Sequence, residues 1–223
     1  MERFFAVRVI HIYNYILFDL DGTLTDPKEG ITRCVQHALR HFGIEREPDS
    51  LTDFIGPPLK QMFETTFNID GDEAVKIYRE RFSTVGLFEN GVYDGIPELL
   101  EALKAAGVAL AVATSKPTVY TLRILEKYDL LKYFDCVVGS ELDGRRTDKA
   151  EVIKEVIDQL GITDLSRAVM VGDRIFDMQG AAKCGIDCVL VEYGYAPEGE
   201  IENCGALYTA KTTSQLEIFL LNR

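Results

Sequence analysis

Short apolar runs recur along the chain, and stretches with helical spacing lie between them. The runs are continuous and not alternating, which is typical of strands buried on both faces of a parallel sheet. They predict five strands, at Tyr15–Leu20, Val108–Ala113, Cys136–Val138, Ala168–Val171 and Cys188–Val191. Because helical patterns separate successive strands, the expected fold class is α/β, with a doubly wound parallel sheet of the Rossmann-like type.

Helices are expected in the gaps between these strands. Residues Ile96–Leu103 carry apolar side chains three and four positions apart, with Pro97 in the first turn and Gly107 after the end. A second helix is expected after Pro117, and a third over Val152–Leu160. These patterns support the alternation of strand and helix.

Residues 27–88 interrupt the alternation, because they contain helical patterns and no good strand. The patterns cover Ile31–Phe42, Leu59–Phe67 and Ala74–Phe82. The segment follows the first strand, at the edge of the sheet where ligands bind in open α/β folds. We therefore expect two domains: an α/β core of residues 1–26 and 89–223, and a helical cap of residues 27–88 above an active site.

Composition narrows the class of protein. The 223 residues include 24 Lys and Arg against 36 Asp and Glu, a net charge of −12. This balance argues against a nucleic-acid partner, because phosphate contacts need a basic face, and equally against a membrane-surface protein. The hydrophobic fraction of 47% is sufficient for a core and excludes global disorder.

The cysteines and the N-terminus indicate a compartment. The five cysteines form no CxxC pair or zinc-ligand set, so reduced thiols are expected. The apolar N-terminus is interrupted by Arg3, Arg8 and His11, and no small-residue cleavage site follows. We expect a cytoplasmic protein whose first dozen or so residues are an extension.

Two acidic residues come directly after the first strand. Asp19 and Asp21 lie two positions apart at the end of a buried strand, where unpaired carboxylates are costly unless they bind a metal ion. For this pair alone, a cap or a turn is an equally good explanation. No GxGxxG follows the strand and no GxxxxGK[ST] occurs, so the common nucleotide-binding loops are absent from the sequence.

A second acidic pair ends the fourth predicted strand. Asp173 follows Gly172, and Asp177 lies one turn into the next helix, so both can face the same side. The alternative for an Asp at this place is a helix cap. Since both acidic pairs end parallel strands, they share one edge of the sheet, and carboxylate oxygens there suit Mg²⁺.

Hydroxyl groups and a lysine complete the candidate chemistry. Thr114 and Ser115 end the second predicted strand before a helix, where hydroxyls and amides can bind an anion or simply cap the helix. Lys149 lies in the first turn of another helix. A positive charge there interacts unfavourably with the helix dipole, at a cost of about 0.3–1 kcal/mol. A lysine at this position is tolerated when it lies on the surface. Beside an acidic metal site, the same lysine would neutralise carboxylate and phosphate charge.

Together these elements resemble the motifs of the haloacid dehalogenase superfamily of phosphohydrolases. The pattern DxDGTLxD is met by Asp19–Asp26, the apolar run ending in Thr by Ala111–Thr114, the basic residue by Lys149, and GDxxxD by Gly172–Asp177. Residues 27–88 resemble the helical type-1 cap of that superfamily. The match extends over nearly the whole chain from Tyr15 onward.

Within the superfamily, the chain is similar to a phosphoglycolate phosphatase-like and 5′-nucleotidase-like group. The stretches Val112–Pro117, Val171–Arg174 and Val138–Gly144 carry this similarity. Ala150 departs from the pattern, because many relatives have proline after the lysine. That difference weakens the phosphoglycolate assignment and leaves the chemistry unchanged.

The resemblance implies roles for individual residues. Asp19 would be the nucleophile and Asp21 the general acid and base. Mg²⁺ would be held by Asp19, Asp173, the backbone carbonyl of Asp21 and, directly or through water, Asp177. Phosphoryl oxygens would be bound by Thr114, Ser115, Lys149 and nearby amides. Substrate specificity would come from the loop that contains Gly56, Pro57 and Lys60, for which an ordinary connection between helices is the alternative.

The function expected from the sequence is hydrolysis of a small phosphate monoester, with phosphoglycolate or a nucleoside 5′-monophosphate as substrate. Two alternatives are a phosphomutase of the β-phosphoglucomutase type and a non-catalytic module that binds a phosphorylated metabolite. A binding module has no need of Asp21, and a protein kinase has no support, because no Gly-rich nucleotide loop or HRD-type segment is present. The sequence leaves the choice between monomer and dimer open.

Overall fold

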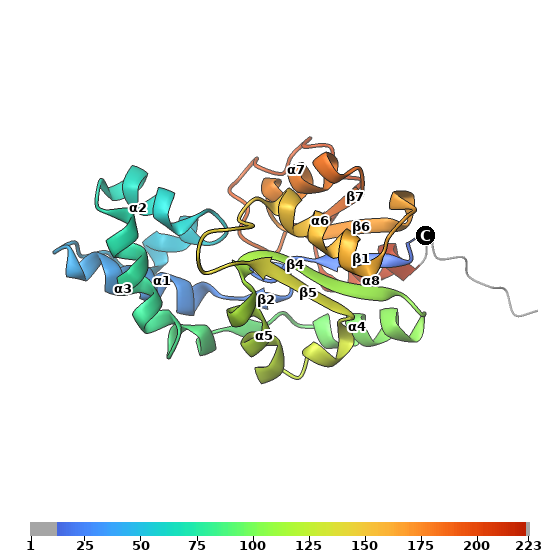
Figure 1. Ribbon diagram of the computed structural model, residues 1–223, viewed down its shortest axis with the longest axis horizontal. Helices are drawn as coiled ribbons and strands as arrows, with labels where there is room; N and C mark the ends of the chain where they lie inside the picture. Colours follow the sequence, from blue (N-terminus) through green and yellow to red (C-terminus); the bar gives the residue numbers. More distant parts are fainter. Residues whose placement is uncertain (1–12, 222–223) are drawn as a thin grey trace, which may run out of the picture.

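The computed structural model describes residues 13–221 and contains a six-stranded parallel sheet (Figure 1). Every neighbouring pair of strands in this sheet is parallel. In spatial order the strands are β5 (Cys136–Ser140), β4 (Ala109–Pro117), β1 (Tyr15–Phe18), β6 (Ala168–Gly172), β7 (Asp187–Val191) and β8 (Tyr208–Ala210). From β1 the chain adds β4 and β5 on one side of the sheet and then β6, β7 and β8 on the other. The predicted doubly wound α/β fold is therefore confirmed.

Helices cover both faces of the sheet. One face packs against α4 (Ile96–Ala105), α5 (Thr118–Lys127) and α8 (Thr213–Leu221), and the other against α6 (Lys149–Leu160) and α7 (Ile175–Cys184). Along β1, Ile16 and Phe18 join the first cluster and Leu17 joins the second, and all three are fully buried. Burial on both faces explains why the strands are continuous apolar runs.

The structure adds elements that the apolar pattern does not predict. Strand β8 is short and includes the half-buried Tyr208 and Thr209, and α8 lacks a clear polar face. Strand β4 continues to Pro117, four residues beyond the predicted end. The register against β5 shifts between Ala113 and Pro117 along this polar segment, and a hydropathy pattern does not contain that information.

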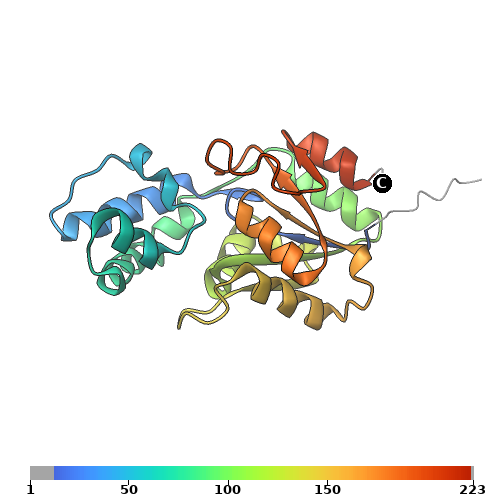
Figure 2. The same cartoon turned by 90° about the horizontal axis from the view of Figure 1, so that it is seen from above.

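Residues 27–88, called the helical insertion below, lie to one side of the sheet (Figure 2). They form α1 (Lys28–His41), the 3₁₀ helix η1 (Pro48–Phe54), α2 (Leu59–Phe67), α3 (Gly71–Phe82) and the 3₁₀ helix η2 (Gly86–Phe88). Two short antiparallel strands, β2 (Thr25–Asp26) and β3 (Gly91–Val92), connect the insertion to the sheet. The three predicted helices are present, and the carboxyl ends of the sheet strands face the insertion.

Within residues 13–221, no helix has the length and apolar character that crossing a membrane requires. All five cysteines are free thiols. The predicted N-terminal extension falls mainly on residues 1–12, outside the part of the chain that the structure describes.

Candidate active site

Three adjacent strands bring the predicted residues to one edge of the sheet. Asp19 follows β1, Thr114 lies near the end of β4, and Asp173 follows β6. The amide of Asp19 donates to the carbonyl of Val171 over 2.8 Å, which continues the ladder between β1 and β6 to the position of the carboxylate. The sheet therefore determines the backbone positions from which these side chains project.

Three carboxylates meet in the interior at this edge. Asp19, Asp173 and Asp177 each offer an oxygen, and these oxygens lie within 4.8 Å of one another. Asp173 and Asp177 are 1% and 0% exposed. Burial, followed by the neighbouring negative charges, raises the pKa of Asp173 well above its usual range. Burial also raises the pKa of Asp177 to about 6, although Lys149 opposes the change.

Lys149 supplies positive charge inside this cluster. Its Nζ lies 2.9 Å from Oδ1 of Asp19 and 2.8 Å from Oδ1 of Asp177, and it donates to the carbonyl of Ala113 over 3.2 Å. The lysine is buried, and the two carboxylates raise its pKa even though burial acts in the opposite direction. Asp148 caps α6 by accepting from the amide of Ala150, which fixes the first turn that carries Lys149.

The surroundings of Asp173 fit a bound divalent cation. Its Oδ2 accepts from the amide of Tyr195 over 2.7 Å. Its Oδ1 is buried and has no hydrogen-bond partner among residues 13–221. A Cβ at Gly22, where φ is +83°, would lie 2.1 Å from Oδ2, so only glycine allows this close approach. A buried carboxylate oxygen without a partner is a suitable ligand for a hard cation.

The side chain of Asp21 lies outside the acidic cluster. After β1 the chain turns, and the amides of Leu24 and Thr25 both donate to the carbonyl of Leu20 over 2.9 Å. The Oδ2 of Asp21 lies 2.7 Å from Nζ of Lys116. Burial raises the pKa of Asp21, and Lys116 opposes that change. The Asp21 carboxylate is therefore paired with Lys116, and the use of the Asp21 carbonyl as a metal ligand stays a prediction.

Lys116 is a site residue that the sequence reasoning missed. It is buried, and its Nζ also lies 4.6 Å from the centre of the Phe82 ring of the helical insertion. The sequence feature that could have indicated a site role for Lys116 is its position directly after Thr114 and Ser115, at the end of β4. A lysine there reads equally well as an ordinary residue before a helix, so only the tertiary contact distinguishes it.

The two hydroxyl residues occupy different environments. The hydroxyl of Thr114 is buried and accepts from the amide of Lys116 over 3.2 Å. The hydroxyl of Ser115 lies 3.5 Å from the carbonyl oxygen of Thr147, in the segment before Lys149. Thr114 therefore contacts the backbone of Lys116 and follows Ala113, whose carbonyl accepts from Lys149, and Ser115 lies toward the start of α6.

The predicted specificity loop contacts the core through a second missed residue, Arg174. Gly56 lies against the guanidinium of Arg174, and Pro57 is half-buried beside it in sequence. Lys60 is exposed and forms an ion pair with Asp72 of α3 over 2.7 Å, within the insertion. Of the three predicted loop residues, Gly56 is the one with a close neighbour beside the acidic cluster.

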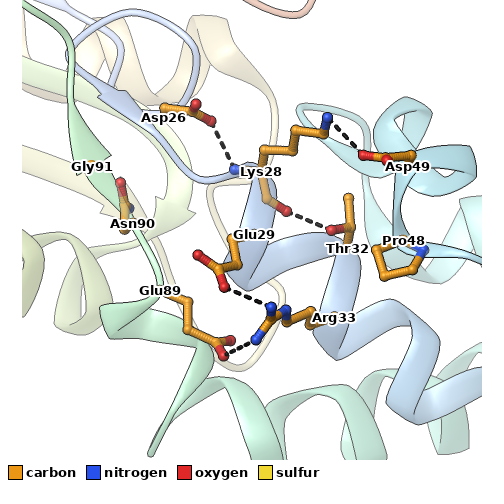
Figure 3. A pocket seen from close by; sticks show the side chains of 10 residues that line it. All are labelled: Asp26, Lys28, Glu29, Thr32, Arg33, Pro48, Asp49, Glu89, Asn90 and Gly91. Atoms are coloured by element: carbon orange, nitrogen blue, oxygen red, sulfur yellow. Dashed lines mark hydrogen bonds and ion pairs between the residues drawn. The ribbon is translucent and has the colours of Figure 1, made fainter.

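A hollow of about 500 Å³ lies elsewhere, beside the two strands that join the insertion to the sheet (Figure 3). Its charged side chains are already paired, with Lys28 2.8 Å from Asp49, and Arg33 2.9 Å from Glu29. None of the predicted site residues lines it. The hollow is thus separate from the acidic cluster.

Comparison with known proteins identifies relatives over most of the chain. The family model described as "Haloacid dehalogenase-like hydrolase" matches residues 16–191. A "5′-nucleotidase" from Pseudomonas aeruginosa is 51% identical over 194 residues, covering 85% of this chain and 87% of that protein. A "Phosphoglycolate phosphatase" from Aquifex aeolicus is 30% identical over 210 residues, covering 93% and 92%.

Two further similarities complete the comparison. "Tyrosine-protein kinase PtkA" from Mycobacterium tuberculosis is 41% identical over 182 residues, covering 81% of this chain and 62% of that protein. The crystal structure of "a predicted phosphatase from Clostridium acetobutylicum" superimposes with a TM-score of 0.90 at 44% identity, covering 95% of this chain and 100% of that chain. The chain therefore belongs to the haloacid dehalogenase-like hydrolase family, and within it to the phosphatases.

Proposed function

We propose that this phosphatase is Mg²⁺-dependent and hydrolyses a small phosphate monoester through an aspartyl-phosphate intermediate. The observation that carries the proposal is the buried cluster of Asp19, Asp173 and Asp177 around Lys149, with Asp21 two positions after Asp19 and paired with Lys116. The relatives' names support phosphoglycolate and a nucleoside 5′-monophosphate as the first substrates to test.

In the first step, a carboxylate oxygen of Asp19 attacks phosphorus and the bond from phosphorus to the ester oxygen breaks. A proton passes from Asp21 to the departing oxygen, which leaves as an alcohol. The need for this proton distinguishes phosphate esters from carbon–halogen bonds, because a halide leaves without one. Asp21 therefore supports ester hydrolysis over dehalogenation.

In the second step, water attacks phosphorus of the aspartyl-phosphate while Asp21 takes a proton from it. The bond between phosphorus and the Asp19 oxygen breaks, so inorganic phosphate leaves and the Asp19 carboxylate is restored. The same two carboxylates thus serve both half-reactions, and the enzyme returns to its starting protonation state.

Asp19, Asp173, Asp177 and the Asp21 carbonyl would hold the Mg²⁺, and the partnerless Oδ1 of Asp173 supports this assignment. When bound, the ion screens the negative charge of the nucleophile from that of the phosphate. Lys149, Thr114 and Ser115 would bind phosphoryl oxygens as charge develops on them. Lys149 already contacts Asp19 over 2.9 Å, so it can act on the nucleophile and the phosphate together.

The helical insertion, residues 27–88, would act as a cap on the core of residues 1–26 and 89–223. It would exclude water from the phosphoryl group and contact the leaving group. Gly56 and Pro57 would supply specificity at the loop next to the core. Lys60 is the weakest member of that set, because its ammonium group is already paired with Asp72. The cytoplasm is the proposed compartment.

Asp19→Asn tests the nucleophile. With Mg²⁺ present, the variant should lose at least about 10³-fold in kcat on p-nitrophenyl phosphate while its circular dichroism is unchanged, because the amide cannot attack phosphorus. Retained turnover would overturn the assignment. EDTA should abolish activity and Mg²⁺ should restore it.

The substrate is tested by ranking kcat/KM over phosphoglycolate, nucleoside monophosphates, sugar phosphates and pyrophosphate. Release of inorganic phosphate identifies a phosphatase, and isomerisation of a sugar phosphate without net release identifies the phosphomutase alternative. Incubation with ATP and a tyrosine-containing peptide gives the kinase control that the PtkA similarity calls for. Absence of turnover for every compound would favour the non-catalytic alternative.

A further inference from the structure

The side chain of Arg174 extends away from the acidic cluster and reaches the helical insertion. Arg174 directly follows Asp173, yet its Nη1 donates to the carbonyl oxygen of Ile55 over 2.6 Å, across 119 positions of sequence. Its own backbone amide donates to Oδ2 of Asp177 over 3.1 Å. One residue therefore contacts the candidate metal site through its backbone and the insertion through its side chain.

Glu200 holds the guanidinium in this orientation. The Nε and Nη2 of Arg174 lie 2.7 and 3.0 Å from Oε1 and Oε2 of Glu200, in a bidentate pair. Glu200 also accepts from the amide of Ile175 over 3.1 Å. Only 8% of the Arg174 side chain is exposed, so the bonds lie largely out of water. A planar fork held on one side by a carboxylate presents its remaining nitrogen in a fixed direction.

The loop of the insertion that receives the Arg174 guanidinium contains a glycine at the point of contact. Gly56 follows Ile55 and has φ of +106°, a conformation that favours glycine. A Cβ at Gly56 would lie 2.6 Å from Nη1 of Arg174. The loop thus needs glycine for two reasons: its backbone conformation and the close approach of the guanidinium.

We propose that Arg174 is a positioning residue that docks the loop of residues 55–58 onto the core and so holds the insertion closed over the site. The proposal rests on the proposed phosphatase function, because closure matters for substrate binding. Because Arg174 directly follows Asp173, its bond to Ile55 holds this loop next to the acidic cluster. The side chain itself makes no contact with substrate in this role, since all three of its nitrogens are bonded within the protein.

A second contact between the two regions serves as a matched control. Nη1 of Arg79, on α3, donates to the carbonyl oxygen of Leu142 in the core over 3.1 Å, at an exposed position. Both contacts join an arginine to a backbone carbonyl between the insertion and the core. They differ in that Arg79 has no bidentate carboxylate partner within residues 13–221, and water competes for its bond.

The variants to compare are Arg174→Gln, Arg174→Lys, Gly56→Ala and Arg79→Gln in the full-length chain with Mg²⁺. We expect Arg174→Gln to raise KM for p-nitrophenyl phosphate about 10-fold or more, with a smaller fall in kcat, from loss of a charge-assisted contact. Arg79→Gln should change KM by less than about 3-fold. Arg174→Lys keeps the charge toward Glu200 and should recover part of the lost affinity. Gly56→Ala should reproduce the effect of Arg174→Gln.

Hydrogen–deuterium exchange gives a readout that does not depend on activity. Amides of residues 55–60 should exchange faster in Arg174→Gln and in Gly56→Ala, while amides of β1 and β6 stay protected. The double variant should be no worse than either single variant, because both remove the same contact. Unchanged exchange at residues 55–60, additive effects, or an equal effect of Arg79→Gln would overturn the proposal.

The test of Arg174 still gives an answer if one variant fails to fold or if the wild-type protein is inactive. If Arg174→Gln fails to fold because Glu200 is left without its partner, Gly56→Ala decides the question, since it leaves that ion pair in place. If the wild-type protein hydrolyses no phosphate ester, the proposed function fails, but the exchange experiment still determines whether Arg174 docks the loop.

Discussion

The core and the helical insertion contribute different kinds of group to the site. The core supplies every charged side chain of the acidic cluster, each from a strand end or the first turn of a following helix. The insertion supplies an aromatic ring, that of Phe82 over Lys116, and a backbone carbonyl, that of Ile55 to Arg174. In the proposed function, the sheet would thus carry the groups that react, and the insertion would carry groups that cover the site.

The two lysines of the site repeat this difference on a smaller scale. Lys149 lies between Asp19 and Asp177 and also donates to the Ala113 carbonyl, and these three partners belong to the core. Lys116 lies between Asp21 of the core and Phe82 of the insertion. The first lysine therefore neutralises the acidic cluster independently of the insertion, whereas the environment of the second depends on it.

The largest effect is expected from Lys149→Met. The change leaves two buried carboxylates without their cation, and breaking a buried ion pair in this way costs about 3–5 kcal/mol of unfolding free energy. We also expect kcat to fall about 10²–10³-fold, because a group aimed at developing charge is removed. Urea denaturation and steady-state kinetics measure both.

Lys183→Met is the control for this change, since Lys183 pairs with Asp148 over 2.9 Å at an exposed position. Its unfolding free energy should change by less than about 1 kcal/mol. Similar losses for the two lysines would contradict the view that the acidic cluster depends on Lys149.

Phe82→Leu tests the contribution of the insertion. The ring covers Lys116, stacks on Tyr78 and meets Tyr120 of the core edge-on, with centroids 5.2 and 5.4 Å away. Loss of the cation–π contact and of packing should lower the unfolding free energy by about 2 kcal/mol. Because Phe82 lies over Lys116, whereas Lys149 is paired with Asp19 and Asp177 of the core, kcat should fall far less than in Lys149→Met.

A drop in kcat as large as that of Lys149→Met would show that the insertion takes part in the chemical step. Ile77→Leu, a conservative change at a partly buried position on the same helix α3, serves as the matched control for folding.

Tyr195→Phe tests the connection between the two regions. The Tyr195 hydroxyl donates to Asp26 in β2, while its amide donates to Asp173. Removing the hydroxyl should cost about 1.5 kcal/mol of stability, the lower end for a hydrogen bond to a charged group. The amide contact with Asp173 persists in the variant, so the apparent Mg²⁺ affinity should stay within about 3-fold; a larger change would mean that the hydroxyl positions Asp173.

A smaller effect is expected from Asp135→Asn in the core. Partial burial raises the pKa of Asp135, but bonds from Lys104 and the amide of Leu110 outweigh it, so the net pKa is lowered. The ionised form therefore adds stability above the ordinary pKa, and this contribution disappears as pH falls through the lowered value. The variant should lose less than about 1 kcal/mol at pH 7, and the difference should vanish in acid.

Asp72→Asn provides the corresponding test in the insertion. Asp72 pairs with Lys60 over 2.7 Å, but its side chain is 78% exposed. Thermal denaturation should show a smaller change than for Asp135→Asn. A larger change would reverse the expected ranking of the two regions.

Much of the site could be predicted because its residues end neighbouring parallel strands. Asp19, Thr114 and Asp173 each follow an apolar run, and adjacency of β4, β1 and β6 is enough to bring them together. Lys149 could be predicted as a partner because a lysine in a first helical turn is locally unfavourable. The roles assigned to these residues remain predictions that the proposed experiments test.

Other features could not be predicted, because they depend on contacts between distant segments. The motif assigns Asp19 and Asp21 different roles, but it does not indicate that Asp19 pairs with Lys149 and Asp21 with Lys116. Arg174 reads as part of a motif, and its bond to Ile55 depends on how the insertion folds back over the core. Residues at short β8 and at α8 lack the apolar periodicity on which the strand and helix predictions rest.

The amino-acid sequence by itself determined the α/β class, the place of the helical insertion and the residue types at the strand ends, because apolar periodicity and local motifs are properties of short segments. The tertiary structure decided which carboxylate faces which lysine, and where the insertion rests on the core. Those outcomes depend on close packing and on desolvation of charges across more than a hundred positions of sequence, which no local pattern contains.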